Sequence, residues 1–196
     1  MLPTMLKADL RRAALARRRA LPANELARRS AELQKHLLEK FAVGAWSWLH
    51  IFLPIPQQNE PDTWHIIHRI WEQKLPVQLA VPVVQPDGRS LRHYALTPAT
   101  PLTPSRWHIP EPAADAPQVA PPSFDAVLVP LLAFDETGHR VGYGKGFYDQ
   151  FLAQCRPDTR RIGVSLEPPV PHIADAWAGD VRLHVCLTPE RLWRFE

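Results

Sequence analysis

The fold of this chain is decided by residues 124–134, FDAVLVPLLAF, and by the glycine-rich segment RVGYGKGFYD at residues 140–149. The first segment is almost continuously apolar, which is typical of a strand buried on both faces of a parallel sheet, and we expect it to end between Pro130 and Phe134. Residues 147–155 carry apolar side chains at helical spacing. The glycine-rich segment therefore connects the end of a strand to the start of a helix.

The glycines of this segment alternate at positions 142, 144 and 146. Because glycine has no Cβ atom, a bulky anion can approach the main-chain amides there, and Arg140 and Lys145 add positive charge. The spacing matches neither the P-loop pattern nor the complete dinucleotide fingerprint, so a plain glycine-rich turn is the alternative to a phosphate site. Phe147 and Tyr148 offer a stacking wall and Asp149 a carboxylate suited to a metal ion, which favours the phosphate site.

The same periodicities organise the rest of the chain. Helices are predicted at residues 5–20, 23–41, 62–74 and 147–155, and strands at 46–53, 77–84, 91–96, 124–134, 161–166 and 181–187. This pattern of helices and apolar strands predicts an α/β fold, a three-layer α/β/α arrangement with a mostly parallel sheet. The 196 residues suffice for a single domain, residues 1–196, with an N-terminal helical segment at 5–41.

Composition argues against several classes of protein. Cys155 and Cys186 form no CxxC pair and no secretory leader is recognisable, so we expect a reduced, cytoplasmic protein. No apolar stretch approaches the roughly 20 residues that a membrane span needs. We therefore expect a monomer that acts on a small molecule, without membrane or nucleic-acid partners.

The formal net charge is +3, and the basic excess lies mostly in the first 30 residues. A helix with a solvated basic face is the common meaning of such a run, and nucleic-acid binding is a second meaning, although no interleaved aromatic residues accompany the charges. Lys7, Arg11 and Arg18 fall within about 40° of one another at 100° per residue. This cationic stripe is a third possibility, because it suits a single polyanionic ligand.

Prolines recur between residues 98 and 122, so neither a long helix nor a central strand is expected there. A disordered linker and an ordered, proline-rich loop are both compatible with this composition. Trp107, among polar neighbours, favours an ordered loop that lines a pocket.

The sequence lacks the motifs of the common covalent and metal-dependent hydrolases. It contains no GxSxG elbow, no HExxH helix and no paired cysteine ligands. His65 and His68 lie one helical turn apart, but without a suitably spaced carboxylate a surface pair is favoured over a metal site. The kind of site that remains is one that positions a phosphate and a metal ion. Such a site accelerates a reaction by orienting the reactants and neutralising charge.

At several positions the chain resembles the 5-formyltetrahydrofolate cyclo-ligase family, also called 5,10-methenyltetrahydrofolate synthetases. The signature is carried by LVP at 128–130 and GHRVGYGKGFYD at 138–149. KADLR at 7–11, EPDT at 60–63, WHIPEP at 107–112 and Asp180 match further family motifs in the same order. The resemblance extends over most of the chain and is far more specific than the glycine-rich segment alone.

This resemblance implies a reaction and a set of site residues. Members of the family convert 5-formyltetrahydrofolate to 5,10-methenyltetrahydrofolate, consuming ATP with Mg²⁺, and the resemblance implies phosphorylation of the formyl oxygen followed by ring closure through N10. Catalytic roles fall to Arg140, Lys145 and Tyr148. By position, ATP contacts fall to Lys7, Arg11, Arg140, Val141, Gly142, Tyr143, Gly144, Lys145, Gly146, Phe147 and Tyr148; folate contacts to Phe52, Leu53, Glu60, Trp107 and Tyr148; and magnesium ligation to Asp149 and Asp180.

Purely structural or solvent-exposed roles are the alternatives to these assignments. Phe52 and Leu53 also suit a core, Glu60 a solvated loop, and Lys7 and Arg11 a solvated helix face. Among the departures from the family pattern, Phe147 stands where tyrosine is frequent, and Gly179 stands where a bulkier residue is usual. Two other functions are kept as alternatives: a catalytically silent folate- or nucleotide-binding relative, and a basic nucleic-acid-binding module.

Overall fold

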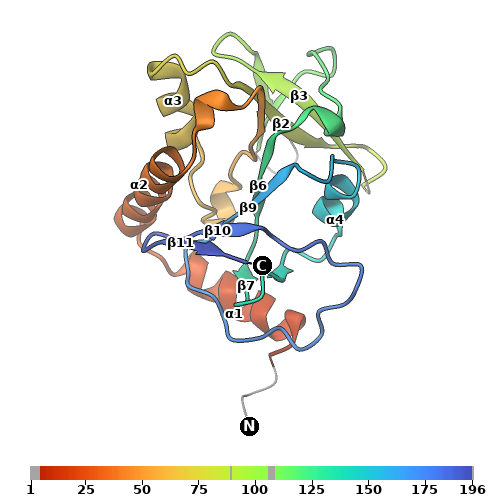
Figure 1. Ribbon diagram of the computed structural model, residues 1–196. Helices are drawn as coiled ribbons and strands as arrows, with labels where there is room; N and C mark the ends of the chain where they lie inside the picture. The colour runs from red at the N-terminus through yellow and green to blue at the C-terminus, as the bar shows by residue number, and fades with distance from the viewer. Residues whose placement is uncertain (1–4, 89, 106–108, 196) are drawn as a thin grey trace.

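The computed structural model describes residues 5–88, 90–105 and 109–195 and has a seven-stranded sheet at its centre (Figure 1). The strand order is β11-β10-β9-β6-β1-β2-β3. The inner strands run parallel, and an antiparallel strand closes each edge. The strands are β1 (Trp48–His50), β2 (Gln78–Val84), β3 (Leu91–Leu96), β6 (Ala126–Pro130), β9 (Arg160–Val164), β10 (Val185–Leu187) and β11 (Leu192–Arg194).

Helices cover both faces of this sheet, which confirms the predicted α/β class and its three layers (Figure 1). Helices α2 (Ala23–Lys40) and α3 (Trp64–Glu72) pack on the face that carries Leu49 and Leu128. The short helix α4 (Phe147–Leu152) packs on the opposite face, against Val127 and Val129. Because successive strand residues point to opposite faces, the continuous apolar run of β6 fills both cores.

The N-terminal helix α1 (Lys7–Arg19) does not cover the sheet but packs on a small hairpin beside it. The hairpin pairs β7 (Ala133–Phe134) with β8 (Arg140–Val141). Leu10 and Ala14 of α1 are buried against it. A small hydrophobic cluster, separate from the cores on the two faces of the sheet, thus holds α1 next to the segment that carries the glycines.

The predicted strand at 124–134 was too long. It divides into β6, which belongs to the large sheet, and β7, which belongs to the hairpin. Pro130 has no amide hydrogen to continue a ladder, and it is the last residue of β6. The chain therefore leaves the sheet at Pro130 and turns toward α1.

The proline-rich segment contains short ordered elements rather than a long helix or central strand. β4 (Leu102–Pro104) pairs with β5 (Pro110–Pro112), and a 3₁₀ turn, η3, spans Pro121–Ser123. Two more 3₁₀ turns, η1 (Val43–Ala45) and η2 (Pro56–Gln58), flank β1. Within the described residues no helix is long and apolar enough to cross a bilayer.

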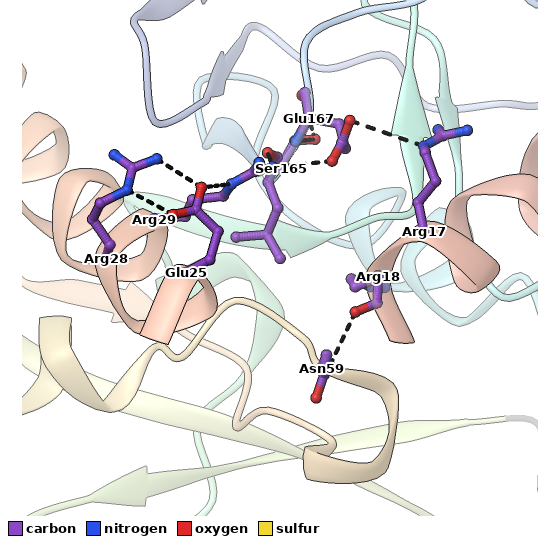
Figure 2. Close-up of polar contacts among 9 residues, drawn as sticks. Arg17, Arg18, Glu25, Arg28, Arg29, Asn59, Ser165 and Glu167 are labelled. Carbon is purple, nitrogen blue, oxygen red and sulfur yellow. Dashed lines mark hydrogen bonds and ion pairs between the residues drawn. The ribbon is translucent and has the colours of Figure 1, made fainter. Parts of the chain in front are cut away.

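Many of the N-terminal arginines are neutralised within the protein (Figure 2). Glu25 accepts hydrogen bonds from Arg28 and Arg29, and these bonds, Arg28 first, lower the pKa of Glu25 to about 2. Glu167 forms ion pairs with Arg29 and with Arg17. Several of the arginines that suggested nucleic acid are therefore paired within helix α2 or join a helix to the loop at Glu167.

Two buried histidines lie within the aromatic core next to α4. His50 of β1 and His93 of β3 have ring centroids 4.9 Å apart and contact Phe124 and Phe151. Both nitrogens of His50 and the Nδ1 atom of His93 have no hydrogen-bond partner in the described structure. Burial lowers the pKa of His93 to about 4 and holds the pKa of His50 well below its usual range. Both rings are therefore neutral at pH 7.

This cluster predicts a loss of stability in weak acid. Since the folded-state pKa values of His50 and His93 lie below the unfolded value of 6.5, protonation favours the unfolded chain. The stabilisation is complete above about pH 6.5 and is lost as the pH falls toward about 4, by up to about 1.4 kcal/mol per pH unit for each ring. Urea unfolding at pH 7.5 and pH 5 measures it. The double variant His50→Leu/His93→Phe should show a smaller difference between the two pH values than the wild type, and an equal difference would contradict the prediction.

Candidate active site

A large cavity, of about 1320 Å³, opens at the carboxyl ends of β1, β2 and β6. Phe52 and Leu53 follow β1, Val84 ends β2 and Pro130 ends β6, and all four line it. At this point the chain has placed β2 on one side of β1 and later returns to place β6 on the other. Such a change of direction in a parallel sheet leaves a crevice where ligands bind.

The glycine-rich loop, residues 142–146, forms one wall of this cavity between β8 and α4. Gly144 and Gly146 have φ values of +86° and +71°, which residues with a Cβ atom rarely adopt. In the described part of the chain no acceptor pairs with the amides of residues 142–146. The loop thus lines the cavity with main-chain amides that are not engaged elsewhere in the described structure.

Helix α1 supplies cations to the same wall. Arg11 Nε donates to the carbonyl oxygen of Gly142 at 2.9 Å, and a Cβ atom on Gly144 would lie 3.3 Å from the Arg11 guanidinium. Lys7 Nζ lies 2.5 Å from Asp180 Oδ2. Arg11 therefore contacts the loop at Gly142 and Gly144, and the positive φ at position 144 favours glycine there.

Arg140 and Lys145 differ in how the protein holds them. Arg140 is buried, with Nη2 2.7 Å from Asp149 Oδ1 and Nη1 donating to the carbonyl oxygen of Val181. Lys145 is exposed and has no partner among the described side chains. Arg140 is thus fixed in place, whereas the Lys145 ammonium is free to pair with a ligand.

Two carboxylates face the cavity from this side. Asp149 also accepts a hydrogen bond from the amide of Val181, and Asp180 accepts one from the amide of Trp177. Burial alone would raise the pKa of Asp180, but the hydrogen bond from Lys7 brings it below its usual value. Both aspartates line the cavity, and among the described residues no group of three or more His, Cys, Asp or Glu side chains gathers into a metal-binding cluster.

A buried carboxylate, Glu60, also lines the cavity. Glu60 is 4% exposed and accepts hydrogen bonds from the Tyr143 hydroxyl at 2.7 Å and from the Ile55 amide at 2.8 Å. Arg18 donates to the same hydroxyl at 3.0 Å. Burial raises the pKa of Glu60 despite these bonds, and burial also raises the pKa of Tyr143, which keeps the phenol neutral. Tyr143 therefore joins the glycine-rich loop to Glu60.

Tyr148 contributes an unused polar group to the cavity wall. Its ring contacts His50 and Phe151, and its buried hydroxyl has no hydrogen-bond partner in the described structure. Burial raises the pKa of this phenol well above its usual value, so it is a donor at neutral pH. A buried hydroxyl without a partner at the edge of a cavity is a natural hydrogen-bonding group for a ligand.

Most of the residues singled out in the sequence meet in this cavity. Those that line it are Lys7, Arg11, Phe52, Leu53, Glu60, Arg140, Gly142, Tyr143, Gly144, Lys145, Gly146, Phe147, Tyr148, Asp149 and Asp180. Val141 is buried against Leu10 and does not line it. Trp107 lies outside the described residues. His65 and His68 lie by a separate, smaller cavity.

Two features of the site were not predicted. Arg18 was expected only as part of a basic stripe, whereas the structure buries it and joins it to Tyr143 and to the carbonyl oxygen of Leu131. Trp177, to which no role was assigned, lines the cavity beside Asp180. Neither contact has a local sequence signal, because the partners are brought together only by the fold.

An α/β domain with bare amides, several cations and two aspartates around one cavity belongs to the class of enzymes that act on phosphorylated ligands. Comparison with known proteins identifies the family. The 5-formyltetrahydrofolate cyclo-ligase family model matches residues 3–170, and the chain belongs to this family. Membership makes it an ATP-dependent ligase of folate one-carbon metabolism that acts on 5-formyltetrahydrofolate.

Individual relatives agree with this assignment. The 5-formyltetrahydrofolate cyclo-ligase of Escherichia coli is 31% identical over 140 residues, 70% of this chain and 76% of the relative. The mouse 5-formyltetrahydrofolate cyclo-ligase is 31% identical over 157 residues, 76% of this chain and 73% of the relative. The solved 5,10-methenyltetrahydrofolate synthetase of Aquifex aeolicus superposes with a TM-score of 0.79 at 27% identity, covering 98% of this chain and 94% of that one.

Proposed function

We propose that the protein converts 5-formyltetrahydrofolate and ATP to 5,10-methenyltetrahydrofolate, ADP and phosphate in this cavity. The observation that carries the proposal is that one cavity joins the bare amides of the glycine-rich loop, with Lys145 unpaired beside them, to the buried carboxylate of Glu60. The amides and Lys145 suit an anion, and the Glu60 carboxylate suits a heterocycle with several hydrogen-bond donors. An anion site and a heterocycle site are both needed when a phosphoryl group is transferred to a folate.

The folate binds on the side of Glu60. Phe52 and Leu53 provide apolar contacts at the end of β1, and the Tyr148 ring provides an aromatic wall. Glu60 accepts hydrogen bonds from the nitrogens of the pterin, and Trp107 is proposed as a further substrate contact. Tyr148 also has a buried hydroxyl without a partner, which makes it the candidate donor to a polar group of the substrate.

The triphosphate binds on the side of the glycine-rich loop, with its terminal phosphoryl group between Arg140 and Lys145. The formyl oxygen attacks the γ-phosphorus, a new O–P bond forms, and the bond to ADP breaks. N10 then attacks the formyl carbon, phosphate leaves with the formyl oxygen, and N10 releases its proton. The protein supplies orientation and positive charge where negative charge develops, and no protein nucleophile is required.

Magnesium is proposed to bind near Asp149 and Asp180. Mg²⁺ is usually held by one or two carboxylates together with water and substrate phosphates, so two aspartates beside a phosphate loop suit it. Both carboxylates line the cavity, and within the described residues Oδ2 of Asp149 and Oδ1 of Asp180 make no hydrogen bond to the protein. When bound, the ion would neutralise phosphate charge.

An absorbance assay tests the proposed function. Purified protein with 5-formyltetrahydrofolate, ATP and Mg²⁺ should produce methenyl absorbance in the near ultraviolet, and omission of ATP or chelation of the metal should abolish it. Folate and nucleotide binding without turnover would instead identify a silent relative. Steeply salt-dependent binding of DNA or RNA without turnover would identify a nucleic-acid-binding protein.

We propose in addition that the protein is a cytoplasmic monomer. Its elution volume from size-exclusion chromatography tests the oligomeric state.

A further inference from the structure

Trp177 is exposed in a way that the rest of the fold does not explain. Among the described residues, Trp177 and Leu6 are the large apolar side chains left in water, and Trp177 is 67% exposed. Trp177 lines the large cavity, whereas Leu6 does not. No aromatic ring or cation of the described structure stacks on its indole. An aromatic face is therefore available to a ligand at the rim of the active site.

The main chain around Trp177 is held in a closed turn. The Trp177 amide donates to Asp180 Oδ2 at 3.0 Å, and the Asp180 amide donates back to the carbonyl oxygen of Trp177 at 3.0 Å. Asp180 is in turn paired with Lys7. The turn is thus anchored to helix α1 and to the cationic wall of the cavity.

Gly179 makes room for the indole. A Cβ atom on Gly179 would lie 2.3 Å from a ring carbon of Trp177, so any other residue at 179 would force the ring to move. The indole therefore packs along the backbone at Gly179. The Trp177 ring therefore occupies the space that a side chain at position 179 would fill.

The chemistry on this side of the cavity is that of a nucleotide site. Lys7, Arg11 and the glycine-rich loop suit phosphates, and an indole at their outer edge suits the flat face of a base. Stacking on an aromatic side chain is strong because every base has a π-face and because it removes apolar surface from water. The pterin, in contrast, is already provided with aromatic and carboxylate groups near Tyr148 and Glu60.

We propose that Trp177 is the base-stacking residue for the nucleoside triphosphate and sets the preference of the enzyme for a nucleotide over a bare polyphosphate. The inference rests on the proposed placement of the phosphates at the glycine-rich loop. It assigns to Trp177 affinity for the base, and no part in the transfer of the phosphoryl group.

Binding calorimetry without folate, in the presence of Mg²⁺, separates the two parts of the nucleotide. ATP contains base and phosphates, whereas inorganic tripolyphosphate contains only the phosphates. Trp177→Ala should weaken ATP binding by about tenfold or more while leaving tripolyphosphate binding within about twofold. Trp177→Phe should keep ATP binding within about threefold, because a ring remains.

Two further variants sharpen the test. Gly179→Ala displaces the indole without removing it, so it should weaken ATP and spare tripolyphosphate in the same way. Leu6→Ala is the matched control, since it removes an exposed apolar side chain outside the cavity, and it should change neither affinity.

Three results would overturn the stacking role. They are an unchanged ATP affinity in Trp177→Ala, an equal loss of ATP and tripolyphosphate affinity in that variant, and a loss of ATP affinity in Leu6→Ala as large as in Trp177→Ala. A different result addresses the proposed function itself. If Lys145→Ala leaves tripolyphosphate binding unchanged, the phosphates do not lie at the glycine-rich loop. The stacking role proposed for Trp177, which depends on that placement, would then also be wrong.

Discussion

Alanine at Lys145 will lower kcat by about 100-fold or more while leaving the affinity for 5-formyltetrahydrofolate within about twofold. Lys145 lies in the glycine-rich loop and has no ion-pair partner in the described structure, so its charge is available to the transferred phosphoryl group. Removing a donor that acts on charge developing in the transition state costs far more in turnover than in ground-state binding. Steady-state kinetics and folate calorimetry on the same preparation give the two numbers.

The exposure of Lys145 makes this substitution easy to interpret. It removes no buried contact, so the thermal unfolding midpoint should stay within about 1 °C of the wild type. Lys35→Ala removes another exposed lysine, in α2 and outside the cavity, and should leave kcat unchanged. Lys145→Arg should recover part of the rate, because charge is retained while the geometry of the head group differs. Turnover of wild-type magnitude in Lys145→Ala would remove Lys145 from the mechanism.

Glutamine at Glu60 will weaken 5-formyltetrahydrofolate binding by about 10- to 100-fold, with a much smaller effect on ATP affinity. The substitution keeps the shape and retains an acceptor for the Tyr143 hydroxyl but removes the charge that favours pterin donors. Hydrogen bonds to a charged partner contribute about 1.5–3 kcal/mol, which corresponds to this range of affinities. Calorimetry with each ligand separately measures both affinities.

Tyr143→Phe is the companion variant for Glu60. It deletes the hydroxyl that joins Glu60 to Arg18 but leaves the carboxylate in place, so folate affinity should fall less than in Glu60→Gln. If Glu60 serves only the architecture of the loop, the two variants should lose thermal stability together and bind folate as the wild type does. That outcome would move the pterin site away from Glu60.

The sequence located the inner strands of the sheet, but the predicted strands at 46–53 and 181–187 were longer than the observed β1 and β10, which have three residues each. β2 and β3 were predicted to within one residue, since each is a short apolar run bounded by turn residues. The hairpin β7–β8 was not predicted, because two-residue strands have no periodicity to detect. Strand β11 (Leu192–Arg194) was also missed, because three residues are too few to show a periodicity. This antiparallel edge of the sheet depends on pairing with β10 rather than on its own segment.

The candidate site was predictable where a motif marks it and unpredictable where only the fold creates it. Gly142, Gly144 and Lys145 stand in one segment, and the structure brings that segment to the cavity wall. The bond between Arg18 and Tyr143 joins residues 125 positions apart, and no spacing rule reports on such a pair. The exposure of Trp177 likewise has no signal in the sequence, because a tryptophan is ordinarily assigned to the core.

A crystal structure of the enzyme with a non-hydrolysable ATP analogue, Mg²⁺ and 5-formyltetrahydrofolate tests the central claim most directly. The account predicts the terminal phosphoryl group against the amides of residues 142–146 and the ammonium of Lys145, with the pterin beside Glu60 and the formyl oxygen facing the phosphorus. A triphosphate bound elsewhere, or a loop whose amides are occupied by protein groups while both ligands are present, would contradict it.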